Sequence, residues 1–205
     1  VFFCLNVAAD LWIFQYRLAI SVHACLNFYD AALAHSLRRI ARSAMQGLAE
    51  NELHRALMLV AEASARALGM RPYPTQLLGA ATLLRGRLVE MQTGEGKTLT
   101  AGLAACVAGA AGVHTHVVTV NDYLAERDAR QLAPLFGFFG LRVGSVVHGV
   151  DAEAKRRAYA CDVAYCTNKE LVFDYLRDRV SAGGRATSAQ LQARRLFAGS
   201  LEAPL

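Results

Sequence analysis

The residues best suited to chemistry lie in the segment VEMQTGEGKTLTAG, residues 89–102. Gly94 and Gly96 are followed there by Lys97 and Thr98. Because glycine adopts backbone conformations that are closed to other residues, consecutive N–H groups can turn toward one oxyanion. A lysine places a point charge on β- and γ-phosphates, and a threonine hydroxyl is suited to coordinate Mg²⁺. These residue types in this order predict a phosphate-binding loop.

The match to the phosphate-loop pattern G-x-x-x-x-G-K-[ST] is incomplete, because Met91 occupies the first glycine position. The rest, TGEGKT, is intact. A G-x-G-K-[ST] pattern arises by chance in roughly one chain per hundred of this size. We expect a short strand at residues 85–91 and a helix at 97–109, which is the context that the loop requires. The alternative is a glycine-rich turn that enters a helix beside an exposed lysine.

Gln76 lies 21 residues before Lys97. A glutamine amide can donate to and accept from an adenine edge at the same time, so it can select adenine. A glutamine near a helix start is more often simply solvated. Its importance as a binding residue therefore depends on the residues that surround it.

Strand patterns and helix patterns alternate after the loop. We expect strands at residues 115–120, 141–147 and 162–167, and helices at residues 122–136, 151–160 and 168–180. Asn121 is the expected cap of the first of these helices. Strands that alternate with helices through short turns predict an α/β fold, in which a parallel sheet has helices on both faces.

The region before the loop is predicted to be helical. Apolar residues recur at three- and four-residue steps over residues 30–48 and again over 51–68. Gly69 is expected to end the second helix. Pro72 and Pro74 disfavour helix at the residues before them, so they mark a break.

The first 29 residues are apolar, but four polar residues interrupt them: Asn6, Asp10, Gln15 and Arg17. They therefore contain no run of about 18 apolar residues that could span a bilayer. We expect a core helix or a helix that lies on a larger body, with membrane contact as the alternative.

The composition indicates a globular chain of 205 residues, 54% of them hydrophobic and 19% charged. The net charge is +5, and the basic residues are scattered in short runs, such as residues 155–157. Such runs are expected to be solvated helix faces, because a nucleic-acid or anionic-lipid surface needs clustering on one face. Five cysteines without a C-x-x-C pair predict neither a disulfide framework nor a zinc site. Small buried cysteines in a reducing compartment are expected, and a reactive thiol is the alternative.

Four segments, in this order and at these spacings, resemble the SecA family of bacterial preprotein translocase ATPases: MRPYPTQLLGA, VEMQTGEGKTLTA, VVTVNDYLAERDA and YCTNKELVFDYLRD. The resemblance covers about residues 65–180. It implies a RecA-like P-loop fold, the first nucleotide-binding domain of that family.

The resemblance also implies ATP and Mg²⁺ as cofactors and assigns site residues. Gln76 would hold adenine, and Met70 and Tyr73 would line the adenine pocket. Arg127 belongs to a motif near the nucleotide, and its role stays open. The residues assigned to the phosphates are Gly94, Glu95, Gly96, Lys97 and Thr98, and Thr98 is also assigned to Mg²⁺.

With this resemblance we expect a helical N-terminal region at residues 1–70 and an incomplete RecA-like domain at residues 71–205, which ends before the acidic Walker B motif. No catalytic residue is assigned within the chain for that reason. The fragment is expected to bind nucleotide without turnover.

The resemblance implies the ATP-binding part of a motor that moves preproteins across the bacterial cytoplasmic membrane. Its partners would be preproteins, a membrane-embedded channel, anionic lipid and a second copy in a homodimer, with no nucleic acid. It would be cytoplasmic and peripherally attached to the inner membrane face. The alternatives are an RNA helicase of the same superfamily and a stand-alone nucleotide-binding module.

Overall fold

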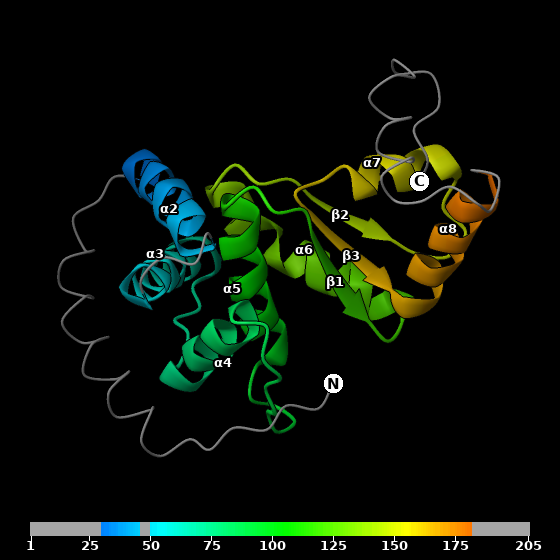
Figure 1. The fold of residues 1–205 in the computed structure, drawn as a ribbon. Helices are drawn as coiled ribbons and strands as arrows, with labels where there is room; N and C mark the ends of the chain where they lie inside the picture. Colours follow the sequence, from blue (N-terminus) through cyan, green and yellow to red (C-terminus); the bar gives the residue numbers. More distant parts are fainter. Residues whose placement is uncertain (1–29, 46–49, 182–205) are drawn as a thin grey trace.

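The computed structural model describes residues 30–45 and 50–181, so the expectation for residues 1–29 lies outside the described part. The chain forms, in order, α2 (Asp30–Met45), α3 (Glu50–Leu68), α4 (Pro74–Leu84), α5 (Lys97–Ala110), β1 (Thr115–Thr119), α6 (Asp122–Phe138), β2 (Val143–Val146), α7 (Ala152–Tyr159), β3 (Val163–Thr167) and α8 (Asn168–Ser181). In Figure 1, α2 and α3 lie at one end of the molecule and α8 at the other, with α5 and the sheet between them.

The described strands form one parallel sheet in the order β1-β3-β2. Val163 of β3 pairs with Thr115 of β1 on one side and with Val143 of β2 on the other. Every residue of β3 is buried, whereas residues of β1 alternate between half-buried and exposed. This is the pattern of a central strand beside an edge strand. The predicted parallel α/β sheet is confirmed.

Helices cover both faces of the sheet. Tyr165 of β3 faces α6, where the ring of Phe136 lies 6.3 Å from its own ring, centroid to centroid. Ala164, the neighbouring residue of β3, points to the opposite face and pairs with Gly144 of β2. On that face Gly144 lies against Ala158 of α7, so closely that a Cβ on Gly144 would be 2.8 Å from the Ala158 Cα.

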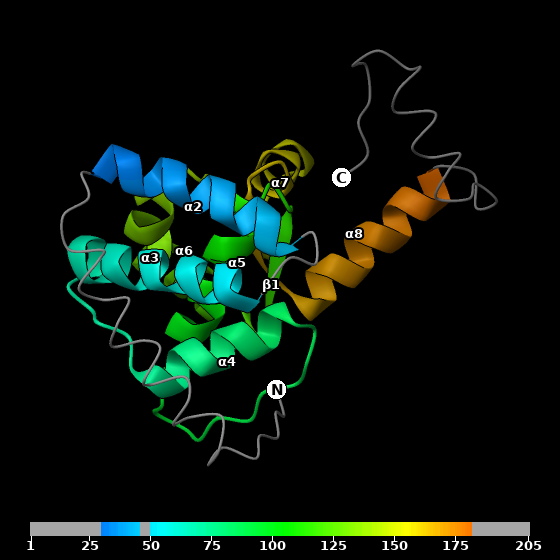
Figure 2. The same cartoon turned by 60° about the vertical axis from the view of Figure 1, so that its left-hand side comes forward.

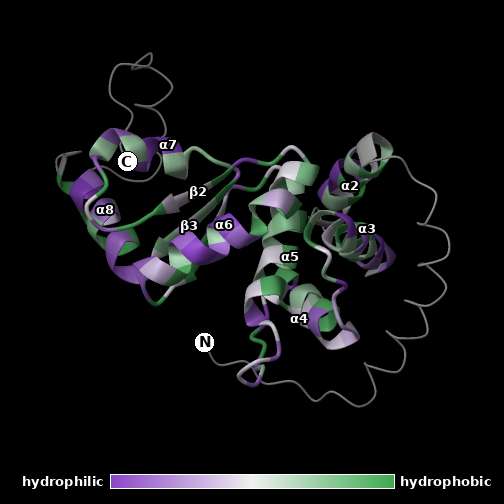
Figure 3. Cartoon of the chain, turned by 180° about the vertical axis from the view of Figure 1, so that it is seen from behind, coloured by the Kyte–Doolittle hydropathy of each residue, from purple (hydrophilic) through white to green (hydrophobic). Residues whose placement is uncertain are grey.

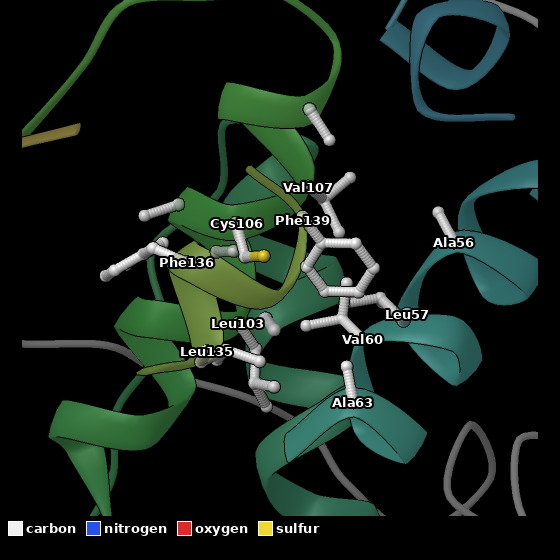
Figure 4. Packing of buried hydrophobic residues seen from close by; sticks show 14 of the residues in the cluster. Ala56, Leu57, Val60, Ala63, Leu103, Cys106, Val107, Leu135, Phe136 and Phe139 are labelled. Carbon is white, nitrogen blue, oxygen red and sulfur yellow. The ribbon is translucent and has the colours of Figure 1, made fainter. Parts of the chain in front are cut away.

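The hydrophobic core joins the N-terminal helices to the helix that follows the loop. Figure 4 shows side chains from α3, α5 and the end of α6 pointing toward one another. Those labelled are Ala56, Leu57, Val60, Ala63, Leu103, Cys106, Val107, Leu135, Phe136 and Phe139. From α2, Leu33 and Leu37 are fully buried in the same core. Several helices therefore fix the direction of α5.

Helix α5 is apolar along most of its length (Figure 3). Residues 102–110 are all buried, and a helix that is hydrophobic all round belongs in a core. None of the helices within the described residues is both long and apolar enough to cross a membrane.

The helix predictions agree closely with the structure, except that helix α4 was not predicted. The Asn121 side chain caps α6, since its Oδ1 accepts a hydrogen bond from the Leu124 N–H at 2.8 Å. Gly69 follows α3 with a φ of 66°. The break at Pro72 is short, because the chain re-enters a helix, α4, at Pro74. Proline suits the first position of a helix, where its fixed φ is already helical and its missing N–H is not needed.

The strand predicted at residues 85–91 is wrong. The structure assigns no strand there, although Val89 is buried with 2% of its surface exposed. A strand is defined by hydrogen bonds to a neighbour, and within the described residues the sheet contains β1, β3 and β2 without this segment. Apolar character alone is enough to bury Val89, but a strand also needs a partner.

The cysteines of the described part are mostly small core residues. Cys106 and Cys166 are buried and Cys161 is half-buried. Burial raises the pKa of Cys166 to about 11 and raises the pKa of Cys106 further. These two thiols are therefore protonated and unreactive at neutral pH. Cys4 and Cys25 lie outside the described residues.

Helix α8 extends from the body of the molecule (Figure 2), and a buried ion-pair network holds it to α7. The Lys155 ammonium on α7 contacts the Glu170 carboxylate and lies 3.1 Å from Asp174 Oδ1, both on α8. The Tyr159 hydroxyl donates to Asp174 Oδ2 at 3.1 Å. Lys155 is only 6% exposed, so the prediction that residues 155–157 form a solvated run is wrong for this lysine.

The network shifts the pKa values of its members. Burial acts to lower the pKa of Lys155, but hydrogen bonds to Glu170 and Asp174 outweigh it and raise this pKa above its ordinary value. The hydrogen bond from Lys155 lowers the pKa of Glu170. Since the folded state holds the charged carboxylate, the stabilisation from Glu170 is complete above its ordinary pKa and disappears as the pH falls through the lowered one.

We expect Lys155→Met to lower the free energy of unfolding by about 3 kcal/mol at neutral pH, because two buried carboxylates lose their buried cation and keep only the exposed Arg177 and His148 as basic partners. The matched control is Glu153→Gln, which breaks an exposed pair with Arg157 and should cost under about 1 kcal/mol. Urea unfolding at a series of pH values measures both. The difference in free energy of unfolding between wild type and Lys155→Met should become smaller as the pH falls below 4.5, the ordinary pKa of Glu170. A difference that is constant from neutral to acid pH would contradict this account.

We expect Gly144→Ala to destabilise the fold by about 1–3 kcal/mol, because the new methyl group meets the backbone of α7, which cannot rotate away as a side chain can. Gly137→Ala in α6 is the control, since nothing lies within 4 Å of its Cβ position. That change should be neutral or stabilising by up to about 1 kcal/mol, as alanine favours helix over glycine. Equal unfolding midpoints for the two variants would show that the contact between α7 and β2 is loose.

Candidate functional site

The loop before α5 presents unpaired backbone donors. Gly94 and Gly96 have φ values of 91° and 82°, in the left-handed region that favours glycine. Gly96 is the N-cap of α5, and the first intrahelical bond runs from the Thr100 N–H to the Gly96 carbonyl at 3.0 Å. The N–H groups of residues 97–99 consequently have no acceptor inside the helix. No side chain of the described chain caps this end.

The electrostatics of the loop favour an anion at that place. The start of α5 carries the positive end of the helix dipole, and no acidic residue occupies its first turn. Lys97 is exposed there and has no ion pair among the described residues. Glu95 Oε2 instead accepts the Gln92 N–H at 2.7 Å, which turns this carboxylate back toward the preceding residues of the loop.

The Gln76 amide lies directly beneath the loop. Gln76 is in the first turn of α4 and is 6% exposed. Its Nε2 donates to the Glu95 carbonyl at 2.9 Å, and its Oε1 accepts the Tyr73 N–H at 3.0 Å. A Cβ on Gly96 would lie 2.2 Å from this Nε2. A side chain at residue 96 would therefore displace the amide from this position. One hydrogen of Nε2 and one lone pair of Oε1 remain for another partner.

The Thr98 hydroxyl points to a carboxylate that the sequence interpretation missed. Thr98 Oγ1 donates to Asp128 Oδ2 at 3.4 Å. The other oxygen, Asp128 Oδ1, accepts from Arg127 Nε at 2.8 Å and from Arg127 Nη2 at 2.6 Å. Hydrogen bonding to Asp128 is the main cause that raises the pKa of Arg127. The guanidinium also lies 5.8 Å from the centre of the Tyr123 ring.

A signal for Asp128 was present in the sequence. Ala125, Asp128, Ala129 and Leu132 recur at helical spacing, and all four are buried on one side of α6. A carboxylate on an apolar stripe needs a partner, because burying an unpaired charge is costly. Arg127 was singled out in the same segment, and the buried residue beside it was overlooked.

The remaining predicted residues lie around α4. Tyr73 is 70% exposed beside the start of that helix, and the Met70 carbonyl accepts the Ser64 hydroxyl at 2.7 Å. Helices α4 and α5 are closely packed, since a Cβ on Gly79 would lie 2.9 Å from Thr100 Cγ2. This packing brings the start of α4 and the start of α5 to the same loop.

The arrangement fits the phosphate chain of a nucleotide with a divalent cation. Unpaired N–H groups and an exposed ammonium suit phosphate oxygens. The Thr98 hydroxyl has a carboxylate acceptor for its proton, so its lone pairs are available to a hard cation that prefers oxygen ligands. The described geometry supports grouping Gly96, Lys97 and Thr98 in one site, with Gln76 below them.

We expect Gly96→Ala to destabilise the chain more than Gly94→Ala. Both variants place a side chain in the left-handed region, at about 1–2 kcal/mol each. The methyl group at residue 96 also overlaps Gln76 Nε2, so this side chain must turn aside and lose its hydrogen bond to the Glu95 carbonyl, at about 1 kcal/mol, whereas the Cβ position of Gly94 is open. Urea unfolding of both variants measures the difference. Equal destabilisation would mean that Gln76 does not support the loop.

Comparison with known proteins identifies the family of the chain. The family model described as the SecA DEAD-like domain matches residues 19–197. The chain is 49% identical over 169 residues to protein translocase subunit SecA 2 of Nitrosospira multiformis, which covers 82% of this chain and 25% of that protein.

Two other relatives are similar to the same degree. The protein translocase subunit SecA of Aliarcobacter butzleri is 52% identical over 132 residues, which is 64% of this chain and 15% of that protein. That of Methylococcus capsulatus is 54% identical over 126 residues, 62% of this chain and 14% of that protein. The chain thus spans a quarter or less of the length of these relatives. It belongs to the SecA DEAD-like domain family.

Proposed function

We propose that the loop at residues 94–98 binds the phosphates of ATP together with Mg²⁺. The observation that carries this proposal is the uncapped start of α5, where the N–H groups of residues 97–99 have no acceptor inside the helix. Those donors, the helix dipole and Lys97 all favour a polyphosphate at one place. A Mg²⁺ ion held by the Thr98 hydroxyl would offset the negative charge of the phosphates.

In this proposal each residue contacts a different part of the nucleotide. The N–H groups around Gly94, Glu95 and Gly96 surround the phosphates, and Lys97 supplies the cation. Thr98 holds the metal through its hydroxyl. Gln76 selects adenine with the hydrogen and the lone pair that its bonds to Glu95 and Tyr73 leave over. Because the amide is buried and held by the backbone, it is oriented before the nucleotide arrives.

At the level of the whole protein, we propose a motor that couples ATP hydrolysis to the movement of preproteins across the bacterial cytoplasmic membrane. The supporting observation is about 50% identity to proteins named protein translocase subunits. This identity favours the translocase over the RNA-helicase alternative. The proposal includes residues 1–70 as a helical N-terminal region and residues 71–205 as part of the RecA-like domain, which binds nucleotide without turnover by itself.

The proposed partners follow from that activity. They are preproteins, a membrane-embedded channel and anionic lipid, with a homodimer as a further assembly and no role for nucleic acid. The proposed location is the cytoplasm, with peripheral attachment to the inner face of the cytoplasmic membrane. A motor of this kind closes its nucleotide site against a second domain during each cycle.

We expect Lys97→Ala to weaken binding of a fluorescent ATP analogue to the 205-residue chain by at least about tenfold, the scale of one lost charge-assisted hydrogen bond. Lys169→Ala is the matched control, because Lys169 is an exposed lysine on α8. Fluorescence titration measures both dissociation constants. If the two variants bind equally well, Lys97 does not contact the phosphates.

In the full-length protein, we expect Lys97→Ala to reduce preprotein-stimulated ATP hydrolysis by about 100-fold or more, as for removal of a transition-state charge contact. Phosphate release with and without an unfolded preprotein is the measurement. If single-stranded RNA stimulates ATP hydrolysis and preprotein does not, the protein is a helicase and not a translocase.

A further inference from the structure

The carboxylate of Asp128 is held in one orientation on α6. Asp128 is 7% exposed, and its Oδ1 accepts two hydrogen bonds from the Arg127 guanidinium at 2.8 and 2.6 Å. These two bonds leave Oδ2 to face α5. There Oδ2 accepts the proton of the Thr98 hydroxyl at 3.4 Å. An ionised carboxylate is an acceptor only, so the direction of this bond is fixed.

That direction has a consequence for the threonine. A hydroxyl has one proton and two lone pairs. When the proton is donated to Asp128, both lone pairs of Thr98 Oγ1 are free to face away from the carboxylate. A hydroxyl that coordinates a cation must present a lone pair and must turn its proton elsewhere. The 3.4 Å contact is long for such a bond, and hydrogen bonds of ligand-free sites often shorten when the ligand binds.

We infer that Asp128 is a positioning residue for the metal: it holds the Thr98 hydroxyl in the orientation that coordinates the divalent cation of a bound nucleotide. This inference rests on the proposed function, because it needs a nucleotide and its cation at the loop. Asp128 acts through Thr98 and touches neither of them. Arg127 serves to fix the carboxylate.

The isosteric change Asp128→Asn reverses the hydrogen bond. The guanidinium of Arg127 needs an acceptor, so the amide oxygen of the new side chain faces Arg127. The amide nitrogen then faces Thr98 and donates to its oxygen. Thr98 loses one lone pair to that bond, and its proton and its one remaining lone pair then compete for the position that faces the cation. The affinity for the nucleotide in the absence of Mg²⁺ should change little, whereas the increase in affinity that Mg²⁺ provides should become smaller.

The test compares the affinity of the 205-residue chain for a fluorescent ATP analogue in Mg²⁺ buffer and in EDTA buffer. The ratio of the two dissociation constants is the Mg²⁺ gain. In Asp128→Asn we expect this gain to fall by about tenfold or more, the scale of a lost charge-assisted contact, with the EDTA value close to wild type. Glu126→Gln is the matched control, since it removes an equal charge from an exposed position of α6 and should keep the gain.

A double-mutant cycle separates positioning from a general effect on the fold. Thr98→Val removes the hydroxyl and should lose the gain by itself. The variant that combines it with Asp128→Asn should lose no more, because Asp128 acts through that hydroxyl. Asp128→Glu keeps an acceptor-only side chain and should retain more of the gain than Asp128→Asn. If Asp128→Asn does not fold, Asp128→Ser takes its place in the cycle.

Two results would overturn the inference: additive losses in the cycle, or a full Mg²⁺ gain in Asp128→Asn, which includes the equal weakening in both buffers that a merely structural role predicts. A wild-type affinity that Mg²⁺ does not change would also overturn it, with nucleotide binding intact. Absence of binding by the wild-type chain in both buffers would overturn the proposed function, and this inference with it.

Discussion

The site depends on one constraint: α5 is buried along its length while its N-terminus stays open. Helices α3 and α6 enclose the middle of α5 (Figure 4), and residues 102–110 are all buried. The N-terminal donors of α5 are unpaired and add no stability. The burial of its other residues therefore supplies the hydrophobic free energy that keeps the helix in place. The Gln76 amide supports the loop from below through the Glu95 carbonyl. An anion can then bind to donors that are already oriented.

Buried charges connect the elements around this core. Asp128 joins α6 to the first turn of α5, and Lys155 joins α7 to α8. In both cases a charged group is nearly excluded from water, so its partners decide its orientation. The two networks have different consequences. Lys155 is matched by acidic partners and links two helices, whereas Asp128 directs a hydroxyl that faces the loop.

Much of the fold was predictable because local patterns and tertiary contacts agree. The parallel sheet, the cap at Asn121 and the end of α3 at Gly69 all follow from short-range rules, and the structure has them. The strand at residues 85–91 was not predictable in the same way, because a strand requires a hydrogen-bonded neighbour from another part of the chain. Helix α4 was missed because Pro74 was read as a breaker, although proline is also a good first residue of a helix.

The sequence by itself determined the order of residues from which a phosphate site is predicted: glycines, a lysine and a threonine, followed by a helix. The family resemblance was also carried by short segments of sequence. Only the tertiary structure showed that Asp128 accepts the hydrogen bond of Thr98 and that Lys155 is buried. Residues 98 and 128 are far apart along the chain, and the packing of α5 against α6 brings them together. Spacing along a sequence reveals which groups share a turn or a helix face, but contacts between elements depend on how those elements pack.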